Sequence, residues 1–414
     1  MNAVDLKTAA KEAWLYVLPL IEVANANIMG LGPDTPLNTL THVRNLADHT
    51  FRDITTPNND TLYSTSKIDL SAGPVTLTLP ASGERYLSLA LMDAYTNNFV
   101  VLGTRATGPD GGTFTLVGPA DAADGANVVR APTNHVWALA RVLIDGPADL
   151  EAARVVQSGL SVQGPAVARP GPIASRRDPW PAYFASAAEL LKANPPPATD
   201  RAQLQRIEGL RLLDGFDPDR FSEDEKAQIA AGVAEAIHDS RRGGLGGASF
   251  VDGWSYPNPA LGDFGQLYGF RAAVALSGLA ALPPVEAMYM RGRGDMPRAL
   301  YDGAKTWRLH FDADRLIPVD GFWSLTLYEA TDDGQYFFAD NPLGRYSIGD
   351  RTEGLTYNAD GSLDIWIGHE SPGEALKGNW LPAPAEPFAL FMRAYIPRAE
   401  LRGGRYRLPP VEEA

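Results

Sequence analysis

Gly321-Phe322-Trp323-Ser324-Leu325-Thr326-Leu327-Tyr328 is the stretch that decides the fold class of this chain. Its large apolar side chains at Trp323, Leu325 and Leu327 alternate with a second set of side chains, which is the period of a β-strand. Residues 363–367 alternate in the same way, directly after a hairpin signal at residues 358–361. We therefore expect the two runs to be neighbouring strands of one C-terminal sheet.

The N-terminal half also has the period of strands, from residue 61 onward. Its short alternating runs are separated by turn signals such as Ala72-Gly73-Pro74. Short strands at this spacing favour a sandwich or an open barrel. The runs lie at residues 63–70, 75–79, 86–93, 98–104, 113–117, 126–131 and 136–143.

Helical and proline-rich segments flank these strands. Residues 3–29 have apolar positions at helical spacing, and Ser222 with Glu225 forms a capping box that opens another helix. We expect a mainly β fold with helices (α+β), in which two β-sandwich-like domains are joined by a helical, Pro-rich connector. The expected parts are an N-terminal helical segment at 1–36, an N-terminal β domain at 37–162, the connector at 163–270 and a C-terminal β-sandwich domain at 271–414.

Several longer phrases occur in a fixed order along the chain. They are Phe51-Arg52-Asp53, Pro57-Asn58-Asn59-Asp60-Thr61-Leu62-Tyr63-Ser64, Met92-Asp93-Ala94-Tyr95-Thr96-Asn97, Pro132-Thr133-Asn134, Trp307-Arg308-Leu309-His310-Phe311, Pro318-Val319-Asp320-Gly321-Phe322-Trp323-Ser324, Asn341-Pro342 with Arg345-Tyr346-Ser347, Asp360-Gly361-Ser362-Leu363 and Asn379-Trp380-Leu381-Pro382-Ala383-Pro384. With these phrases the chain resembles bacterial proteins that carry two domains of unknown function in tandem, numbered 1254 (N-terminal) and 1214 (C-terminal). The resemblance covers about residues 12–162 and 272–410 and implies a two-domain architecture.

The composition excludes several classes of partner. The formal net charge is −14, whereas nucleic-acid binding needs a basic face that neutralises phosphates. The same charge argues against anionic membrane surfaces, and no apolar run approaches the roughly 20 residues of a membrane helix. A small-molecule ligand is the partner we expect, and a homo-oligomer is compatible with the composition.

The chain contains no cysteine, which excludes disulfides, thiolate nucleophiles and iron–sulfur clusters. No cofactor is indicated, and any metal should be an oxygen-ligated divalent cation such as Ca²⁺ or Mg²⁺. The first residues lack the basic and apolar regions of a signal peptide, so the sequence as written predicts the cytoplasm. A periplasmic location would require a leader ahead of the sequence given.

Amides, a carboxylate and a phenol precede the first strand, at Asn58, Asn59, Asp60 and Tyr63. Asn and Asp at such a position commonly form Asx-turns with their own backbone. The functional alternative is that strand-end polar groups converge on a cleft, where they orient a substrate or a cation. Arg52 is either a surface ion pair with its neighbour or a fork for a substrate carboxylate.

A second polar set, Asp93, Tyr95 and Asn97, alternates where one strand ends and the next begins. Three polar side chains on one face are either solvated or line a cavity. The titratable candidates of the C-terminal domain are His310, on an expected strand, and His369, just after another. Each histidine is either structural or an acid–base group.

The remaining candidates come from the C-terminal phrases. Trp323 and Trp380 either pack in the core or stack on a ligand, and core packing does not require the polar Arg345 and Asn379. No metalloprotease, α/β-hydrolase, NTPase or Rossmann motif occurs.

We expect a small-molecule enzyme, a hydrolase or lyase, that acts on an organic and carboxylate-bearing substrate between the domains. Asp60, Asp93, His310 and His369 would be catalytic. The other candidates would bind substrate. The alternative is a non-catalytic carbohydrate- or lipid-binding protein of the cell envelope, which should have an aromatic platform and no acid–base pair.

Overall fold

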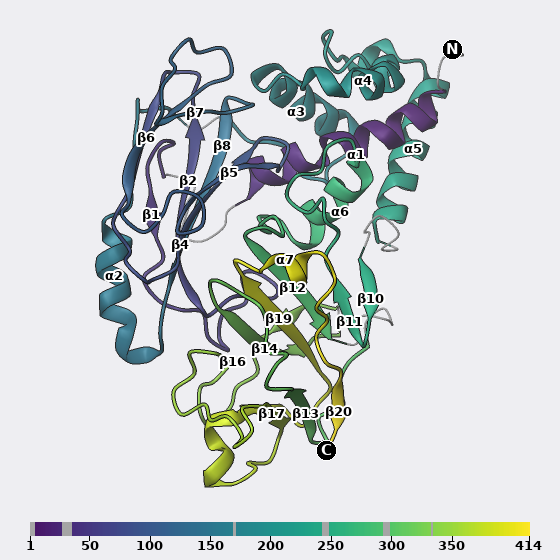
Figure 1. Ribbon diagram of the computed structural model, residues 1–414. Helices are drawn as coiled ribbons and strands as arrows, with labels where there is room; N and C mark the ends of the chain where they lie inside the picture. Colours follow the sequence, from purple (N-terminus) through teal and green to yellow (C-terminus); the bar gives the residue numbers. More distant parts are fainter. Residues whose placement is uncertain (1–4, 27–34, 169–170, 242–247, 293–298, 333) are drawn as a thin grey trace.

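The computed structural model describes residues 5–26, 35–168, 171–241, 248–292, 299–332 and 334–414. It has an α+β fold with several sheets and a group of helices, which confirms the predicted fold class (Figure 1). Among the described residues, no helix is both long enough and apolar enough to cross a membrane.

Two sheets form the N-terminal sandwich. They pack through Leu62, Leu89 and Ala138 on one side and Leu77 and Leu116 on the other. The inner N-terminal sheet has the order β1 (Thr41–His42), β2 (Thr61–Asp69), β8 (His135–Leu143), β4 (Leu87–Asp93) and β5 (Asn98–Gly103). The outer N-terminal sheet has the order β7 (Val128–Arg130), β6 (Gly112–Val117), β3 (Val75–Leu79) and β9 (Ser161–Gln163).

The C-terminal sandwich is built in the same way. Its inner sheet has the order β10 (Ser249–Val251), β11 (Trp254–Tyr256), β12 (Ala287–Gly292), β19 (Phe388–Tyr395), β14 (Trp323–Ala330) and β15 (Tyr336–Phe337), with β16 (Ser347–Gly349) also paired to β14. Its outer sheet has the order β18 (Trp380–Pro382), β17 (Leu363–Gly368), β13 (Trp307–Phe311) and β20 (Val411–Glu413). A large apolar core fills the space between these two sheets.

The two alternating runs of the sequence are both strands, but they are not neighbours. β14 pairs with β19, β15 and β16, whereas β17 pairs with β13 and β18. The prediction of one shared sheet is therefore wrong. Alternation tells which side of a strand is buried but not which strand lies beside it. Leu325 of β14 and Ile365 of β17 instead belong to one core between the sheets.

The helices form a third body against the sheets. α1 (Leu6–Asn25) packs on α5 (Glu223–Arg241), α6 (Tyr268–Ser277), α3 (Trp180–Ala193) and α4 (Arg201–Ile207). The predicted capping box is confirmed, because the Ser222 and Glu225 side chains each bond the other residue's backbone amide. The remaining elements are α2 (Leu150–Ser158), α7 (Ala399–Arg402) and the 3₁₀ turns Pro147–Asp149, Ala198–Asp200, Glu208–Leu210, Pro218–Arg220 and Glu374–Asn379.

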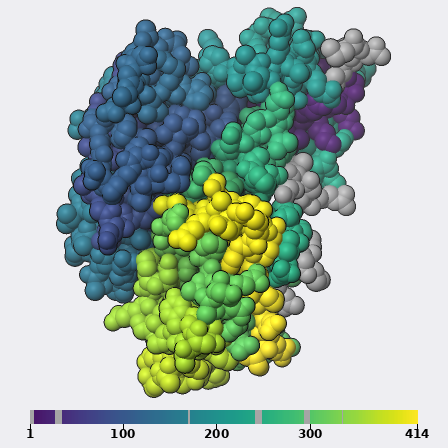
Figure 2. All heavy atoms as spheres, in the orientation of Figure 1, coloured from purple at the N-terminus to yellow at the C-terminus, as the bar shows by residue number. Residues whose placement is uncertain are grey.

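The two inner sheets face each other. Tyr86 and Leu143 of the N-terminal domain share an apolar cluster with Phe322 and Tyr395 of the C-terminal domain. Figure 2 shows the atoms of the two domains in contact on the face it presents. The contact surface contains buried polar side chains, such as Asp60 and Arg393, as well as aromatic ones.

Candidate functional site

Asp60 is the centre of the polar contact between the domains. It lies at the entry to β2, and only 6% of it is exposed. Its Oδ2 accepts a hydrogen bond from Ser324 Oγ at 2.6 Å, and its Oδ1 accepts one from Ser347 Oγ at 3.3 Å. Both serines belong to the inner C-terminal sheet, so the Asp60 carboxylate joins the two domains.

Asn58 combines the two roles that the sequence left open. Its Oδ1 accepts a hydrogen bond from the Asp60 amide at 2.6 Å, which is a local Asx-turn. Its Nδ2 donates to the Tyr395 hydroxyl of the other domain at 2.7 Å. The turn therefore holds Asn58 and Asp60 in position while both side chains reach the C-terminal sheet.

Arg393 on β19 also bonds residues of both domains at this contact. It donates to Thr326 Oγ1 at 2.6 Å, to the Tyr328 hydroxyl at 2.6 Å and to the Thr56 carbonyl oxygen at 3.1 Å. Burial opposes its charge, but the nearby tyrosines and Asp60 hold the Arg393 pKa above its usual value. Burial also raises the pKa of Tyr328 to about 12. The described hydrogen bonds of this group therefore go to other protein groups and hold the two domains together.

A pocket lies on the other side of β14. Trp323 and Ser324 point to opposite faces of this strand, so Trp323 lines the pocket while Ser324 contacts Asp60. The cavity measures about 230 Å³ and opens between the two sheets of the C-terminal sandwich. Its lining is Phe311, Leu316, Ile317, Val319, Gly321, Trp323, Asp350, Tyr357 and Leu363.

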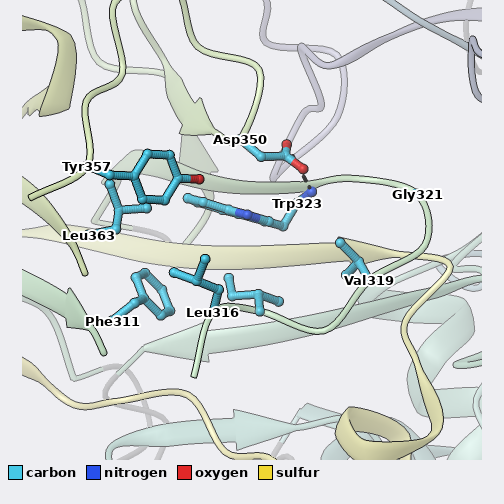
Figure 3. Close-up of a pocket in the computed structure, with 9 residues that line it drawn as sticks. Phe311, Leu316, Val319, Gly321, Trp323, Asp350, Tyr357 and Leu363 are labelled. Carbon is cyan, nitrogen blue, oxygen red and sulfur yellow. Dashed lines mark hydrogen bonds between the residues drawn. The ribbon is translucent and has the colours of Figure 1, made fainter. Parts of the chain in front are cut away.

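Asp350 is the one charged side chain of this lining. The residue as a whole is exposed just after β16, whereas 28% of its side chain is exposed. The Trp323 amide donates to Asp350 Oδ1 at 3.4 Å. Figure 3 draws Asp350 and Tyr357 on the same side of the Trp323 ring, with Phe311 and Leu316 on the other.

Burial raises the pKa of Asp350 to about 6, even though the neighbouring Arg351 charge lowers it. The charge of Asp60 raises it further, which links the pocket to the domain contact. Burial and then the Asp350 charge raise the pKa of Tyr357, so its hydroxyl stays protonated at neutral pH. A carboxyl that titrates near neutrality beside a neutral phenol can accept and return a proton.

Arg351 ties this pocket to the N-terminal domain. Its Nη1 donates to the Ile144 carbonyl oxygen at 3.0 Å and to Asp145 Oδ1 at 2.9 Å. Its guanidinium lies 4.1 Å from the centre of the Phe322 ring, and its Nε lies 3.6 Å from Asp350 Oδ1. The position of Asp350 therefore depends on how the domains dock.

The structure does not bring the second N-terminal motif to this site. Asp93 Oδ1 accepts hydrogen bonds from the amides of Tyr95 and Asn97, both at 2.9 Å, and so forms a turn of its own. Burial raises the pKa of Asp93. The Tyr95 hydroxyl points into the helical body and donates to the Asn194 carbonyl oxygen at 2.8 Å. Asn97 supports the next turn through a hydrogen bond from the Phe264 amide.

The two candidate histidines also lie apart from the pocket lining. His310 projects from the outer C-terminal sheet, where its Nδ1 lies 2.7 Å from Asp364 Oδ1. His369 Nδ1 lies 3.1 Å from the Ala383 carbonyl oxygen. Within the described part of the chain, neither histidine forms a hydrogen bond with Asp60, Asp93 or Asp350.

The remaining candidates divide between the domain contact and the C-terminal loops. Tyr63 stacks with a buried arginine of β8, and the Asn59 side-chain oxygen is buried without a hydrogen-bond partner. Arg52 pairs with Glu329 at 2.8 Å. Three other candidates hold C-terminal loops in place. Arg345 donates to the carbonyl oxygens of Lys377, Gly378 and Trp380. Asn379 bonds the backbone of Thr356 and Asp364, and Trp380 Nε1 donates to the Gly368 carbonyl oxygen.

Asp350 and Tyr357 were not singled out by the sequence. Asp350 follows β16 directly, and such a strand-end position is where rigid sheets hold functional groups. Two features of the sequence could have identified Asp350: this strand-end position and the nearby Arg345-Tyr346-Ser347 motif. Among the residues that the structure describes, no group of three or more histidines and carboxylates could hold a metal ion.

Comparison with known proteins agrees with this architecture. Residues 37–164 match the family described as "Protein of unknown function (DUF1254)", and residues 286–399 match the one described as "Protein of unknown function (DUF1214)". The chain thus belongs to the family of proteins that carry these two domains in tandem, as its motifs predict. No curated protein matches it.

One solved structure shares the fold, and a second has a lower similarity. The crystal structure of the VPA0106 protein from Vibrio parahaemolyticus superposes with a TM-score of 0.75 at 22% identity, over 99% of this chain and 100% of that one. A putative uncharacterized protein from Burkholderia cenocepacia has a TM-score of 0.46 at 14% identity, over 97% of this chain and 88% of that one. The likeness to the Vibrio parahaemolyticus protein shows a shared fold and nothing about function.

Proposed function

We propose that this protein is an enzyme that acts on small organic molecules by general acid–base chemistry, as a lyase or hydrolase. The observation that supports this proposal is Asp350, a carboxyl with a pKa of about 6 in a pocket whose other side chains are apolar or aromatic. An ideal proton-transfer group has a pKa near the working pH. A carboxyl at its ordinary pKa would be a much weaker base.

The pocket has room for a compact substrate. A cavity of about 150 Å³ is enough for benzene, so about 230 Å³ suits one ring with a substituent. The flat side chain of Trp323 and the edges of Phe311 and Leu316 would hold the apolar part. The polar or reactive end would then face Asp350 and Tyr357.

The chemistry follows from these two groups. Ionised Asp350 would take a proton from the substrate, and the Tyr357 hydroxyl would donate a hydrogen bond to the negative charge that develops. Apolar walls strengthen both interactions because they exclude water. In a lyase the proton comes from carbon and a leaving group departs, whereas in a hydrolase it comes from an attacking water.

The alternative function, binding without catalysis, has one observation in its favour. The Trp323 and Phe311 rings give the pocket an aromatic wall, which is enough to bind an apolar ligand. Binding of an apolar ligand does not require a carboxyl of raised pKa, and covering the Asp350 charge would weaken it. Catalysis therefore accounts for more of the lining than binding does.

A probe substrate tests the proposal without knowledge of the natural one. A base in an apolar pocket takes the ring C–H proton of 5-nitrobenzisoxazole while the N–O bond breaks, and the coloured 2-cyano-4-nitrophenolate forms. We expect a rate above that of buffer, which rises as the pH passes about 6. Asp350→Asn should lower that rate by roughly a hundredfold or more.

Matched variants separate this reaction from reaction at the surface. Asp314→Asn changes the net charge equally but lies exposed in the loop before β14, and it should leave the rate unchanged. Tyr357→Phe should lower the rate by roughly tenfold, the effect of losing one neutral hydrogen bond. An Asp350→Asn rate equal to that of the unsubstituted protein, or an absence of pH dependence near 6, would refute the proposal. Saturable binding of the probe without turnover would favour the binding protein instead.

A further inference from the structure

Arg141 is a buried cation that no function has yet accounted for. It lies on β8, on the face of the inner N-terminal sheet that meets the C-terminal domain, and only 5% of it is exposed. Its cross-strand neighbours are Tyr63 on β2 and Ser88 on β4. The guanidinium carbon lies 5.4 Å from the centre of the Tyr63 ring.

The hydrogen bonds of Arg141 are incomplete. A guanidinium has five N–H donors, and Nη2 of Arg141 donates to the Ala280 carbonyl oxygen at 3.1 Å. Nη1 is buried and has no hydrogen-bond partner. Among the described residues, none of the carboxylates lies within ion-pair distance of Arg141. A buried guanidinium with unused donors and no carboxylate partner lowers the stability of the fold unless another group compensates its charge.

Two other buried arginines show what compensation looks like in this fold. Arg393 donates to three side-chain or backbone oxygens within 3.1 Å, as described above. Arg271 has a buried Nε without a hydrogen-bond partner, but the rings of three tyrosines enclose its guanidinium and its charge interacts with the nearby Asp93 carboxylate, which offsets part of the rise that burial causes in the Asp93 pKa. Arg141 contacts one ring, that of Tyr63, and its described surroundings include no carboxylate charge comparable to Asp93.

The surroundings of Arg141 suit an anion that enters from the domain contact. Tyr86 and Tyr395 lie ring to ring at 5.3 Å across the contact and share an apolar cluster with Tyr289. Thr61, one pair further along β2 on the same face, also has a buried hydroxyl without a partner. The Ser88 hydroxyl, opposite Arg141 on β4, is buried without a partner as well, so three unpartnered polar groups of one face point to a missing component rather than to an isolated defect.

We propose that Arg141 binds a small carboxylate anion between the two domains. The planar guanidinium matches a carboxylate through two parallel N–H···O bonds, and Nη1 supplies a donor that the protein itself does not use. Phenol rings around the site accept the apolar part of such an acid. The site would be distinct from the Asp350 pocket, and it does not depend on the acid–base function proposed there.

Acetate, as the sodium salt, is the probe for this site. Equilibrium dialysis of the unsubstituted protein against ¹⁴C-acetate should give saturable binding that approaches one anion per chain. Acetate should also raise the melting temperature by about 2–5 °C at saturation, because a ligand of the folded state stabilises it. Arg141→Met should abolish both effects, and Arg141→Lys should weaken binding by roughly tenfold because an ammonium cannot make the two-point contact.

The control variant is Arg398→Met, which removes an exposed arginine paired with Asp320 and should leave acetate binding unchanged. Sodium chloride at the same ionic strength should compete weakly. Non-saturable uptake by the unsubstituted protein, or equal binding by Arg141→Met, would overturn the proposal. Chloride that binds as tightly as acetate would overturn the carboxylate assignment. Should Arg141→Met fail to fold, the dialysis result on the unsubstituted protein and on Arg141→Lys still decides.

Discussion

Asp350→Asn should make the protein more stable at neutral pH, in a way that depends on pH. The folded protein holds the Asp350 proton with a pKa of about 6, against an ordinary value of 3.8. Because the pKa of Asp350 is higher in the folded than in the unfolded protein, its bound proton favours the folded state. This contribution to stability is complete below about pH 4 and is lost as the pH rises through about 6.

The magnitude follows from the two pKa values. At about 1.36 kcal/mol per unit of pKa, the interval corresponds to at most about 3 kcal/mol of unfolding free energy lost at neutral pH. The side chain keeps 28% of its surface exposed, so we reduce the expectation to about 1–2 kcal/mol. Asparagine keeps the shape and the acceptor for the Trp323 amide but has no charge to bury.

Urea unfolding followed by tryptophan fluorescence measures the difference. At about pH 7.5 we expect Asp350→Asn to unfold at higher urea than the unsubstituted protein, and at about pH 3.5, below the unfolded pKa, the two should agree within about 0.5 kcal/mol. Asp314→Asn, which is exposed, should follow the unsubstituted protein at both pH values. A variant that is less stable at neutral pH, or one with an unchanged pH profile, would refute the reasoning about Asp350.

Three further changes test the contacts that surround the site. Asp60→Asn removes the charged acceptor of the Ser324 hydroxyl and should lower the unfolding free energy by about 1–3 kcal/mol in urea titrations; no loss would mean that this carboxylate does not hold the domains together. Gly349→Ala places a methyl 2.2 Å from a carbonyl oxygen of β14 and should cost about 1–3 kcal/mol, whereas Gly171→Ala meets open space and should be neutral; equal melting temperatures would contradict the close approach. Ser222→Ala breaks the capping box of α5 and should lower stability by about 0.5–2 kcal/mol, with a circular dichroism melt as the measurement and an unchanged melt as the contrary result.

The local elements of this fold could be predicted from the sequence because they depend on neighbours along the chain. Alternation located β14 and β17, and the Ser222 box located the start of α5. The pairing of β14 with β19 could not be predicted in this way, since 57 residues separate Ala330 from Phe388 and alternation has no information about partners.

The same difference between local and long-range contacts applies to the residues of the candidate site. Asp60 was found because its strand-entry position is local, and its contact with Ser324 follows from the docking of two sheets. Asp350 was missed because its raised pKa arises from burial and from side chains distant in sequence, among them Asp60. Asp93 looked similar to Asp60 in the sequence, yet its carboxylate is used by its own turn.

The polar face that carries Arg141 has a consequence for biosynthesis. β8 ends at Leu143 and β14 begins at Trp323, so 179 residues must be translated before β14 can join the covering sheet. At about 5–20 residues per second, the ribosome needs roughly 10–40 s for that interval. During this time the nascent N-terminal sandwich presents Arg141 and Tyr63 to water, where the guanidinium is hydrated at no cost. A face of this composition resists aggregation while it waits, which a purely apolar contact of the same size would not.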